Sequence, residues 1–145
     1  MNDKKQVLIL CTGNSARSQM AEGLLREIGD DKYTVESAGV APSKVRPEAV
    51  EAMREIGFDI SGHRSKSVDE FSEKQFDYII TVCDNAKESC PVFSGNATHI
   101  HQSFEDPPPE TVGDYESRLK IFRRVRDEIR DWLKIFVSRI EKREL

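Results

Sequence analysis

The sequence predicts an α/β fold: a single-domain, three-layer sandwich in which a four-stranded parallel sheet carries helices on both faces. Three observations lead to this prediction. Short apolar segments alternate with longer segments whose apolar residues recur at helical spacing, the pattern of strands joined by right-handed crossovers. The first short segment is apolar without alternation, as in a parallel strand covered on both faces. The length of 145 residues suits one domain, and without a linker or repeat we expect it to span residues 1–145.

Four short segments are expected to form the strands. Residues 7–10, Val-Leu-Ile-Leu, are the uniformly apolar segment. Residues 33–37 alternate between apolar and polar side chains and predict a more exposed strand. Residues 78–82 predict a third strand, and residues 98–101 a weaker fourth.

The intervening segments are expected to be helical. Apolar residues recur at helical spacing over residues 20–28, and Gly29 ends that run. Pro47 opens a second helix, which Gly57 closes, and residues 67–71 can form one short helix. The last third of the chain keeps one apolar stripe, which we expect to pack against the sheet as core. The residues of that stripe are Leu119, Phe122, Val125, Ile129, Trp132, Phe136 and Ile140.

Composition and charge exclude several classes of protein. The net charge of −4 argues against broad nucleic-acid binding, which needs a basic face. No apolar stretch approaches the roughly 20 residues that cross a bilayer, and the polar start does not resemble a signal peptide. We therefore expect a cytoplasmic protein that does not bind membranes, and a monomer because no second apolar stripe is evident. The three cysteines form no dense framework, so catalytic, metal-binding or inert thiols are favoured over structural disulfides.

The segment from Cys11 to Ser18 lies between the first predicted strand and the first predicted helix. Ligands of doubly wound sheets bind at the carboxyl ends of the strands. Five small or polar loop residues can direct N–H groups at one anion there, and Gly13 and Asn14 tolerate positive φ. The helix N-terminus and the donor fork of Arg17 add positive charge. The residues expected to bind a tetrahedral oxyanion are Thr12, Gly13, Asn14, Ser15, Ala16, Arg17 and Ser18.

Cys11 is the expected nucleophile of this site. The positive field should lower its pKa and make thiolate available at neutral pH, and Ser18 can donate a hydrogen bond to the sulfur. The alternative is a buried, inert cysteine beside a surface arginine. The position of Cys11 between a strand and a helix, with glycine inside the loop, favours a nucleophilic cysteine over an inert one. The segment is not a nucleotide P-loop, because that motif needs glycine followed by lysine and Ser/Thr.

Two further cysteines point to redox chemistry. Cys83 ends the third predicted strand, so it can approach the sheet edge that holds Cys11, and Cys90 lies a short polar segment further on. Oxidation can pass from Cys11 to Cys83 and then to Cys90, because attack of a thiolate on sulfur is the elementary step. The second transfer requires the intervening segment to rearrange. A buried, inert Cys83 is the main alternative, and a zinc site lacks the usual paired short spacing.

We expect no bound metal and no cofactor. His99 and His101 alternate on the weak fourth strand and face the same side. Ordinary strand packing is favoured over a metal pair for both.

The loop after the fourth predicted strand supplies a candidate general acid. Asp106 can protonate a departing oxygen, and Pro107 stiffens its presentation. Glu105 is the rival acid, and a solvated loop carboxylate is the ordinary alternative for either residue. The choice of Asp106 depends on the resemblance that follows.

The chain resembles the thioredoxin-coupled arsenate reductases, which are built on the low-molecular-weight tyrosine phosphatase fold. The anion loop alone is shared with the phosphatases, and the set of three cysteines makes the reductase resemblance specific. The resemblance runs through nearly the whole chain. The segments that carry it are residues 11–23, residues 37–39, Cys83, Cys90, Asp106-Pro107 and residues 124–129.

The resemblance implies a catalytic cycle. Arsenate lies in the loop on Arg17 and main-chain N–H groups, Cys11 attacks arsenic, and Asp106 assists the loss of water. Cys83 then attacks Cys11 and releases arsenite. Cys90 takes over to give a Cys83–Cys90 disulfide, which thioredoxin reduces. Arsenate as substrate, thioredoxin as partner and a role in arsenic detoxification are therefore expected.

The chain departs from the family in one place. Some members bind potassium beneath the loop through residues that match Asn14, Glu22 and Ser37, together with an aspartate. Lys66 stands at the position of that aspartate. Its ammonium group can occupy the place of the cation and pair with Glu22, so we expect no potassium requirement.

Two other functions stay open. A low-molecular-weight protein tyrosine phosphatase would use Cys11, Arg17 and Asp106, but it needs an aromatic wall for the phosphotyrosine ring. No aromatic residue lies between residues 39 and 57 or from 106 to 114, which favours a small inorganic anion. A weak side activity on aryl phosphates stays compatible with this. The third alternative, an anion-binding module without turnover, leaves the two extra cysteines unexplained.

Overall fold

The computed structural model describes residues 4–89, 93 and 95–145 of the chain. Four parallel strands form one sheet in the order β2-β1-β3-β4. The strands are β1 (Lys5–Cys11), β2 (Tyr33–Gly39), β3 (Tyr78–Thr81) and β4 (Thr98–His101). The helices are α1 (Arg17–Gly29), α2 (Pro47–Arg54), α3 (Asp84–Ser89) and α4 (Tyr115–Glu141), with 3-10 turns at Asp30–Lys32 and Val68–Phe71. The predicted four-stranded parallel sheet is confirmed.

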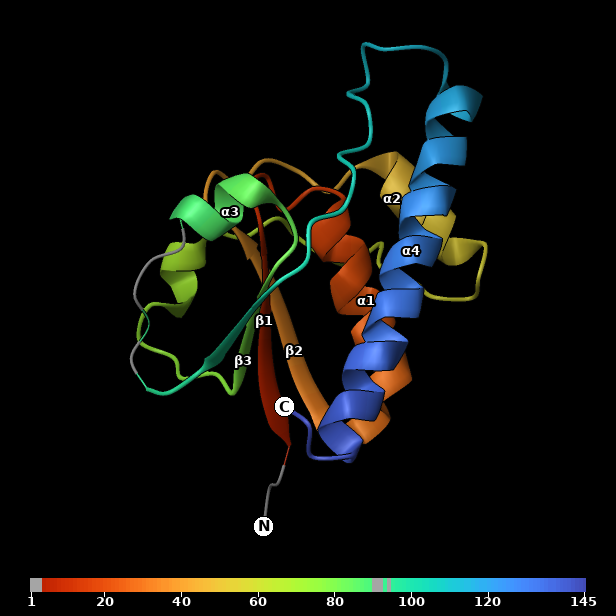
Figure 1. The fold of residues 1–145 in the computed structure, drawn as a ribbon. Coiled ribbons are helices and arrows are strands. Elements are labelled where there is room, and N and C mark those ends of the chain that lie inside the picture. The colour runs from red at the N-terminus through yellow and green to blue at the C-terminus, as the bar shows by residue number, and fades with distance from the viewer. Residues whose placement is uncertain (1–3, 90–92, 94) are drawn as a thin grey trace.

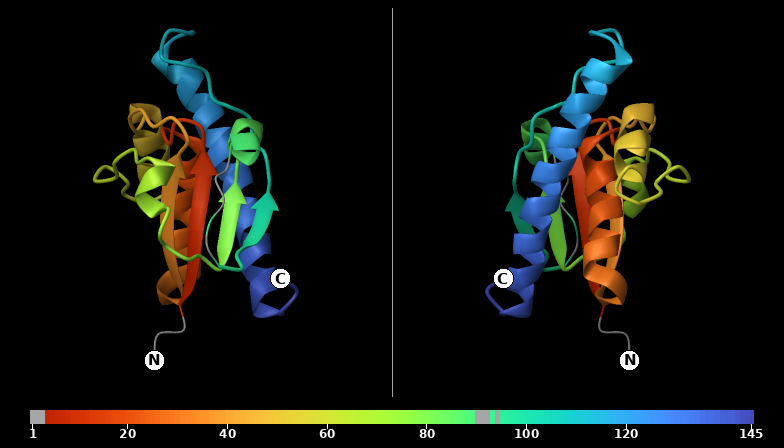
Figure 2. Two further views of the ribbon diagram at one scale, coloured as in Figure 1. Left: turned by 90° about the vertical axis from the view of Figure 1, so that its left-hand side faces the viewer. Right: turned by 90° about the vertical axis from the view of Figure 1, so that its right-hand side faces the viewer.

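The elements form three layers around this sheet. Helices α1, α2 and α4 cover one face, and α3 lies on the other face with the 3-10 turn Val68–Phe71 (Figure 1). The two side views agree, since α1 and α4 lie in front of the strands in one view and α3 in the other (Figure 2). Helices on both faces are therefore confirmed, although the layer that contains α3 is the thinner one.

The core follows the sequence pattern. Residues 7–10 of β1 are fully buried between the two layers, as expected of a central parallel strand. In α4 the predicted stripe is buried along Leu119, Phe122 and Ile129, while Trp132 is partly buried. The stripe packs against α1 and α2. Burial of such side chains contributes about 1.5–3 kcal/mol each.

Several boundaries differ from the prediction. Strand β2 continues to Gly39 because its last residues pair with the end of β1, and β3 ends at Thr81. The predicted helix over residues 67–71 is a 3-10 turn whose N-cap residue, Ser67, accepts a hydrogen bond from the Asp69 N–H. Helix α3 follows Cys83 directly in a segment for which no helix was assigned. Cys90 lies outside the described residues.

Among the described residues, no helix combines the length and the apolarity that a membrane span requires.

Candidate active site

A cavity lies at the carboxyl end of β1. It has a volume of about 340 Å³, and its floor is the loop between β1 and α1, as predicted from the sheet topology. The described residues that line it are Cys11, Thr12, Gly13, Ser15, Ala16, Arg17, Arg46, Asp106, Pro107 and Pro109. Two members of the predicted binding set, Asn14 and Ser18, are not on this wall. They are buried behind the loop and hold its shape.

Asn14 is the residue that turns the loop. Its φ of 48° is positive, whereas Gly13 is not among the described residues with positive φ. The Asn14 side chain donates to Ser18 Oγ at 2.8 Å and to Ser37 Oγ at 3.0 Å. Its Oδ1 accepts from Gln19 Nε2 at 2.8 Å and from the Lys66 N–H at 2.9 Å. Asparagine stabilises a left-handed backbone conformation when its short side chain is bonded in this way, so the amide group fixes the loop.

The hydroxyl of Ser18 has a different partner from the predicted one. Ser18 Oγ accepts the hydrogen bond from Asn14 Nδ2. A hydrogen bond from Ser18 to the Cys11 sulfur is not formed among the described residues. Ser18 therefore acts on the loop conformation and not directly on the nucleophile.

Cys11 and Cys83 are both free, buried thiols, and each is the largest influence on the pKa of the other. Cys83 Sγ also lies 3.2 Å from Thr12 Oγ1 and accepts the N–H of Ala86 at 3.4 Å. The expected approach of Cys83 to the sheet edge that holds Cys11 is confirmed.

Charge in this pair lies mainly on Cys83, which corrects the expectation for Cys11. The hydrogen bond from Cys11 lowers the pKa of Cys83 to about 5, with further help from Thr12 and Ala86. The same contact, followed by burial, raises the pKa of Cys11 well above its ordinary value, although Arg17 opposes this. The two thiols share one proton. The sequence could not show this because it depends on a contact between residues 72 positions apart, as their numbers give.

Arg17 joins the anion loop to the segment that holds the candidate acid. Its Nη1 donates to the Phe104 carbonyl at 3.1 Å, and its Nη2 lies 3.4 Å from Asp106 Oδ1. Glu105 instead pairs with Arg124 of α4 at 2.9 Å. The geometry therefore places Asp106, and not its rival, at the cavity.

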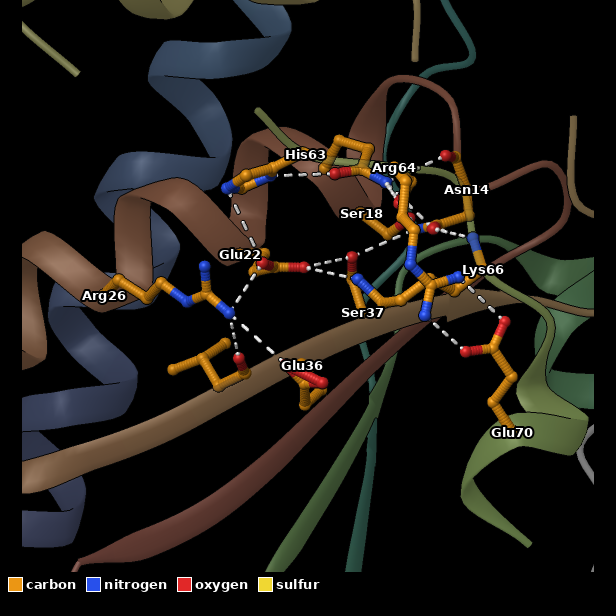
Figure 3. Close-up of polar contacts among 12 residues, drawn as sticks. Asn14, Ser18, Glu22, Arg26, Glu36, Ser37, His63, Arg64, Lys66 and Glu70 are labelled. Carbon is orange, nitrogen blue, oxygen red and sulfur yellow. Dashed lines mark hydrogen bonds and ion pairs between the residues drawn. The ribbon is translucent and has the colours of Figure 1, made fainter. Parts of the chain in front are cut away.

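A polar cluster lies beneath the loop (Figure 3). Lys66 Nζ lies 3.4 Å from Glu22 Oε1, so the predicted ion pair is confirmed. Glu22 is 1% exposed and has three more partners: Ser37 Oγ at 2.5 Å, Arg26 Nη2 at 2.9 Å and His63 Nε2 at 3.6 Å. These contacts satisfy a carboxylate that would otherwise be costly to bury.

Of the two strand histidines, His99 is exposed and His101 makes two polar contacts. His101 Nδ1 lies 2.8 Å from Thr81 Oγ1 and its Nε2 lies 2.9 Å from Asp84 Oδ1. Within residues 4–89, 93 and 95–145, no group of three or more His, Cys, Asp or Glu side chains is placed to hold a metal ion.

Several residues of the site were not identified from the sequence. Arg46 and Pro109 line the cavity, and Gln19 links Asn14 to His63, whose Nδ1 lies 2.9 Å from Gln19 Oε1. Arg46 directly precedes the proline that opens α2. The sequence signal that could have identified Arg46 is its position as a basic residue directly before a helix that begins at the sheet edge.

Comparison with known proteins agrees with this site. The family described as low molecular weight phosphotyrosine protein phosphatase matches residues 6–145. Arsenate reductase 2 of Staphylococcus saprophyticus is 43% identical over 134 residues, which cover 92% of this chain and 97% of that protein. A solved arsenate reductase in its oxidized state has a TM-score of 0.78 at 31% identity, covering 94% of this chain and 98% of that one. The low molecular weight protein tyrosine phosphatase from T. tengcongensis has a TM-score of 0.76 at 27% identity, covering 94% and 99%.

The family match covers residues 6–145, the range in which the anion loop, Cys11 and the segment that holds Asp106 lie. These matches confirm the resemblance to arsenate reductases on the phosphatase fold. The chain belongs to the low molecular weight phosphotyrosine protein phosphatase family.

Proposed function

We propose that this protein reduces arsenate to arsenite by a relay of three thiols and serves arsenic detoxification. The observation that carries the proposal is the presence of two free, buried thiols at a cavity of about 340 Å³: Cys11 lines the cavity, and Cys83 Sγ lies 3.2 Å from Oγ1 of its neighbour Thr12. Hydrolysis of a phosphate ester needs one such thiol, whereas reduction of arsenate needs the two electrons that a thiol pair supplies. The names of the similar proteins support the same assignment.

In the proposed first step, Cys11 attacks arsenic(V). Arg17 and the loop N–H groups of residues 12–16 hold the oxyanion, and as it binds, the proton shared by the thiols moves to Cys83 so that the Cys11 sulfur can react. A new S–As bond forms. One arsenate oxygen, which already carries a proton, takes a second proton from Asp106 and leaves as water.

In the second step, the sulfur of Cys83 attacks the sulfur of Cys11, and the proton of Cys83 passes to an oxygen of the departing arsenite. An S–S bond forms and the S–As bond breaks, and the electron pair of the broken bond stays on arsenic. Arsenic(V) is thereby reduced to arsenic(III) and leaves as arsenite, while the two thiols are oxidised to a disulfide. Cys90 then attacks Cys83, which restores Cys11, and the dithiol of thioredoxin reduces the resulting Cys83–Cys90 disulfide.

The cavity favours a small inorganic oxyanion. The described residues that line it include no aromatic side chain that could embrace a phosphotyrosine ring. Protein tyrosine phosphatase activity is the second candidate, because the loop, Arg17 and Asp106 suit both reactions and one similar structure is a phosphatase. We expect at most a weak hydrolysis of aryl phosphates.

Thiol mapping tests the relay. Reduced protein is incubated with arsenate, and arsenite and disulfides are quantified by mass spectrometry. The wild type is expected to release one arsenite per chain and to accumulate the Cys83–Cys90 disulfide. Cys90→Ser is expected to stop at the Cys11–Cys83 disulfide, because no third thiol can resolve it.

The same assay has two controls. Thioredoxin with its reductase is expected to restore repeated turnover of the wild type and not of Cys90→Ser. Multiple turnovers of arsenate by Cys83→Ser or Cys90→Ser would refute the relay. Turnover with glutaredoxin but not with thioredoxin would refute thioredoxin as the partner and would not affect the assignment of the active site.

The Lys66–Glu22 pair leads to a prediction about monovalent cations. Because the Lys66 ammonium already neutralises Glu22 beneath the loop, activity and melting temperature are expected to be the same in potassium and in sodium chloride. Lys66→Met is expected to lower the melting temperature in both salts, since Glu22 keeps only its other partners. A wild type that becomes more active and more stable in potassium than in sodium would contradict this prediction.

We also propose that residues 1–145 act as one functional domain, as a monomer in the cytoplasm. The free state of Cys11 and Cys83 suits a reducing compartment.

A further inference from the structure

The segment of residues 104–113, which we name the acid loop, is held mainly by arginine side chains. Residues 107–109 are prolines and have no N–H to donate. Phe104 and Val112 donate backbone N–H groups to Val82 and Pro109. The carbonyls of the acid loop instead accept hydrogen bonds from arginines at three places along its length: Arg17 at Phe104, Arg46 at Pro108 and Arg118 at Val112 and Gly113.

Arg46 connects the acid loop to the anion loop. Its backbone N–H donates to the Ser15 carbonyl at 2.9 Å, and its Nη2 donates to the Pro108 carbonyl at 3.0 Å. Its guanidinium lies 5.0 Å from the centre of the Phe122 ring of α4, and its side chain is 12% exposed. Arg46 therefore bridges the floor of the cavity and the acid loop at Pro108, as Arg17 does at Phe104.

A buried carboxylate holds Arg46 in this position. Glu48, which is 1% exposed, accepts Arg46 Nη2 and Arg118 Nε at 2.8 Å each on the same oxygen. Burial would raise the pKa of Glu48, but the hydrogen bonds from the two arginines outweigh it and the pKa lies below its ordinary value. Glu48 is thus ionised at neutral pH and fixes two of the arginines that reach the acid loop.

We propose that Arg46 is a positioning residue that holds Asp106 at the distance from the anion loop at which it can protonate the leaving oxygen. This inference rests on the proposed function, because it assigns Arg46 a role through the acid step. Asp106 itself has only a 3.4 Å ion pair with Arg17 among the described contacts, and its side chain is 77% exposed. Its position therefore depends on the backbone that Arg46 anchors two residues further on.

A double-mutant cycle tests this role. The single-turnover rate of arsenate reduction is measured for the wild type, Arg46→Met, Asp106→Asn and the double variant, so that no electron donor is needed. Arg46→Met is expected to slow the rate by roughly tenfold to hundredfold, since a misplacement of about 1 Å can cost 10²-fold. In the Asp106→Asn background the same change is expected to cost less than about twofold, because residues that act as one unit are not additive.

Further measurements separate positioning from general damage. The inhibition constant of inorganic phosphate is expected to stay within about threefold in Arg46→Met, because Arg17 and the anion loop remain. Arg46→Lys keeps the charge and is expected to restore part of the rate. Arg123→Met is the matched control, since it removes another ion pair that joins α4 to the end of α2, between Arg123 and Glu55 at 2.7 Å, without touching the acid loop.

The possible failures are distinct. If Arg46→Met lowers the single-turnover rate by the same factor in the wild-type and in the Asp106→Asn background, and Asp106→Asn is itself slow, the positioning role is refuted and the proposed function stays intact. Asp106→Asn as fast as the wild type would remove the acid from the proposed function and this role of Arg46 with it. A wild type that does not reduce arsenate would refute the proposed function as a whole. If melting curves show that Arg46→Met does not fold, the double-mutant cycle is repeated with Arg46→Lys. The positioning role is then judged by whether the loss of rate is smaller in the Asp106→Asn background.

Discussion

Replacement of Cys83 by alanine is expected to abolish arsenate reduction and, at the same time, to make Cys11 more reactive at neutral pH. Reduction stops because no second thiol can attack the S–As adduct. Cys11 becomes more reactive because its hydrogen bond with Cys83 is the largest cause of its raised pKa. Without that contact the pKa of Cys11 falls relative to the wild type, and a thiolate alkylates where a thiol does not.

The measurement is the rate of Cys11 alkylation by iodoacetamide as a function of pH, followed by mass spectrometry. The midpoint is expected at lower pH in Cys83→Ala than in the wild type. Cys11→Ala is the reciprocal variant: the pKa of Cys83 is expected to rise from about 5, because its main stabilising hydrogen bond is lost. Identical alkylation profiles for Cys11 in wild type and Cys83→Ala would show that the two thiols do not share a proton.

A methyl group at Gly39 is expected to disrupt oxyanion binding without touching any charged side chain of the cavity. A Cβ there would lie 2.6 Å from the Thr12 carbonyl oxygen and 2.9 Å from the Asn14 nitrogen, both of them backbone atoms of the anion loop. The loop must shift to accommodate it. Overpacking of this kind costs about 1–3 kcal/mol of stability, and loss of one hydrogen bond to a charged ligand costs about 1.5–3 kcal/mol.

Calorimetric titration with inorganic phosphate measures this effect in Gly39→Ala, which is expected to bind roughly tenfold to hundredfold more weakly than the wild type. Gly62→Ala is the matched control, because a Cβ at Gly62 meets nothing within 4 Å. Wild-type affinity in Gly39→Ala would mean that the loop tolerates the displacement and that its backbone does not form the binding surface.

The sheet and the anion loop could be predicted because local sequence determines them. The uniformly apolar residues 7–10 of β1, followed directly by Cys11 and then by a helix with Arg17 at its start, fix the order strand, loop, helix. The topology of a parallel sheet then brings the end of β3, and with it Cys83, to the same edge. The Lys66–Glu22 pair, in contrast, was predicted from the family resemblance, because Lys66 stands where some members have an aspartate of a potassium site.

The distribution of charge within the site could not be predicted because it depends on contacts distant in sequence. The field of the loop alone suggested a thiolate at Cys11, whereas the neighbouring Cys83 takes most of the charge. The choice of Asn14 over Gly13 for the positive φ is a similar case. Glycine is the more permissive residue, but it has no side chain that could bond to Ser18 and Ser37.

The arginine contacts of the acid loop were missed for a related reason. Arg46, Glu48 and Arg118 look like ordinary charges of a solvated helix surface in the sequence. Only the packing of α2 against α4 buries Glu48 and brings both arginines onto one of its oxygens. A charged residue that becomes buried through tertiary contacts carries no local signature.

The four hydrogen bonds of the Asn14 amide have a thermodynamic implication for ligand capture. All of them are made within the chain, so the conformational entropy of the turn is lost when the protein folds and not when an oxyanion arrives. Binding of the oxyanion then carries almost no further entropy cost for ordering the loop, so the free energy of each N–H contact to the oxyanion contributes almost fully to the affinity. A tetra-oxo anion with few atoms can therefore be retained without a mobile lid closing over it.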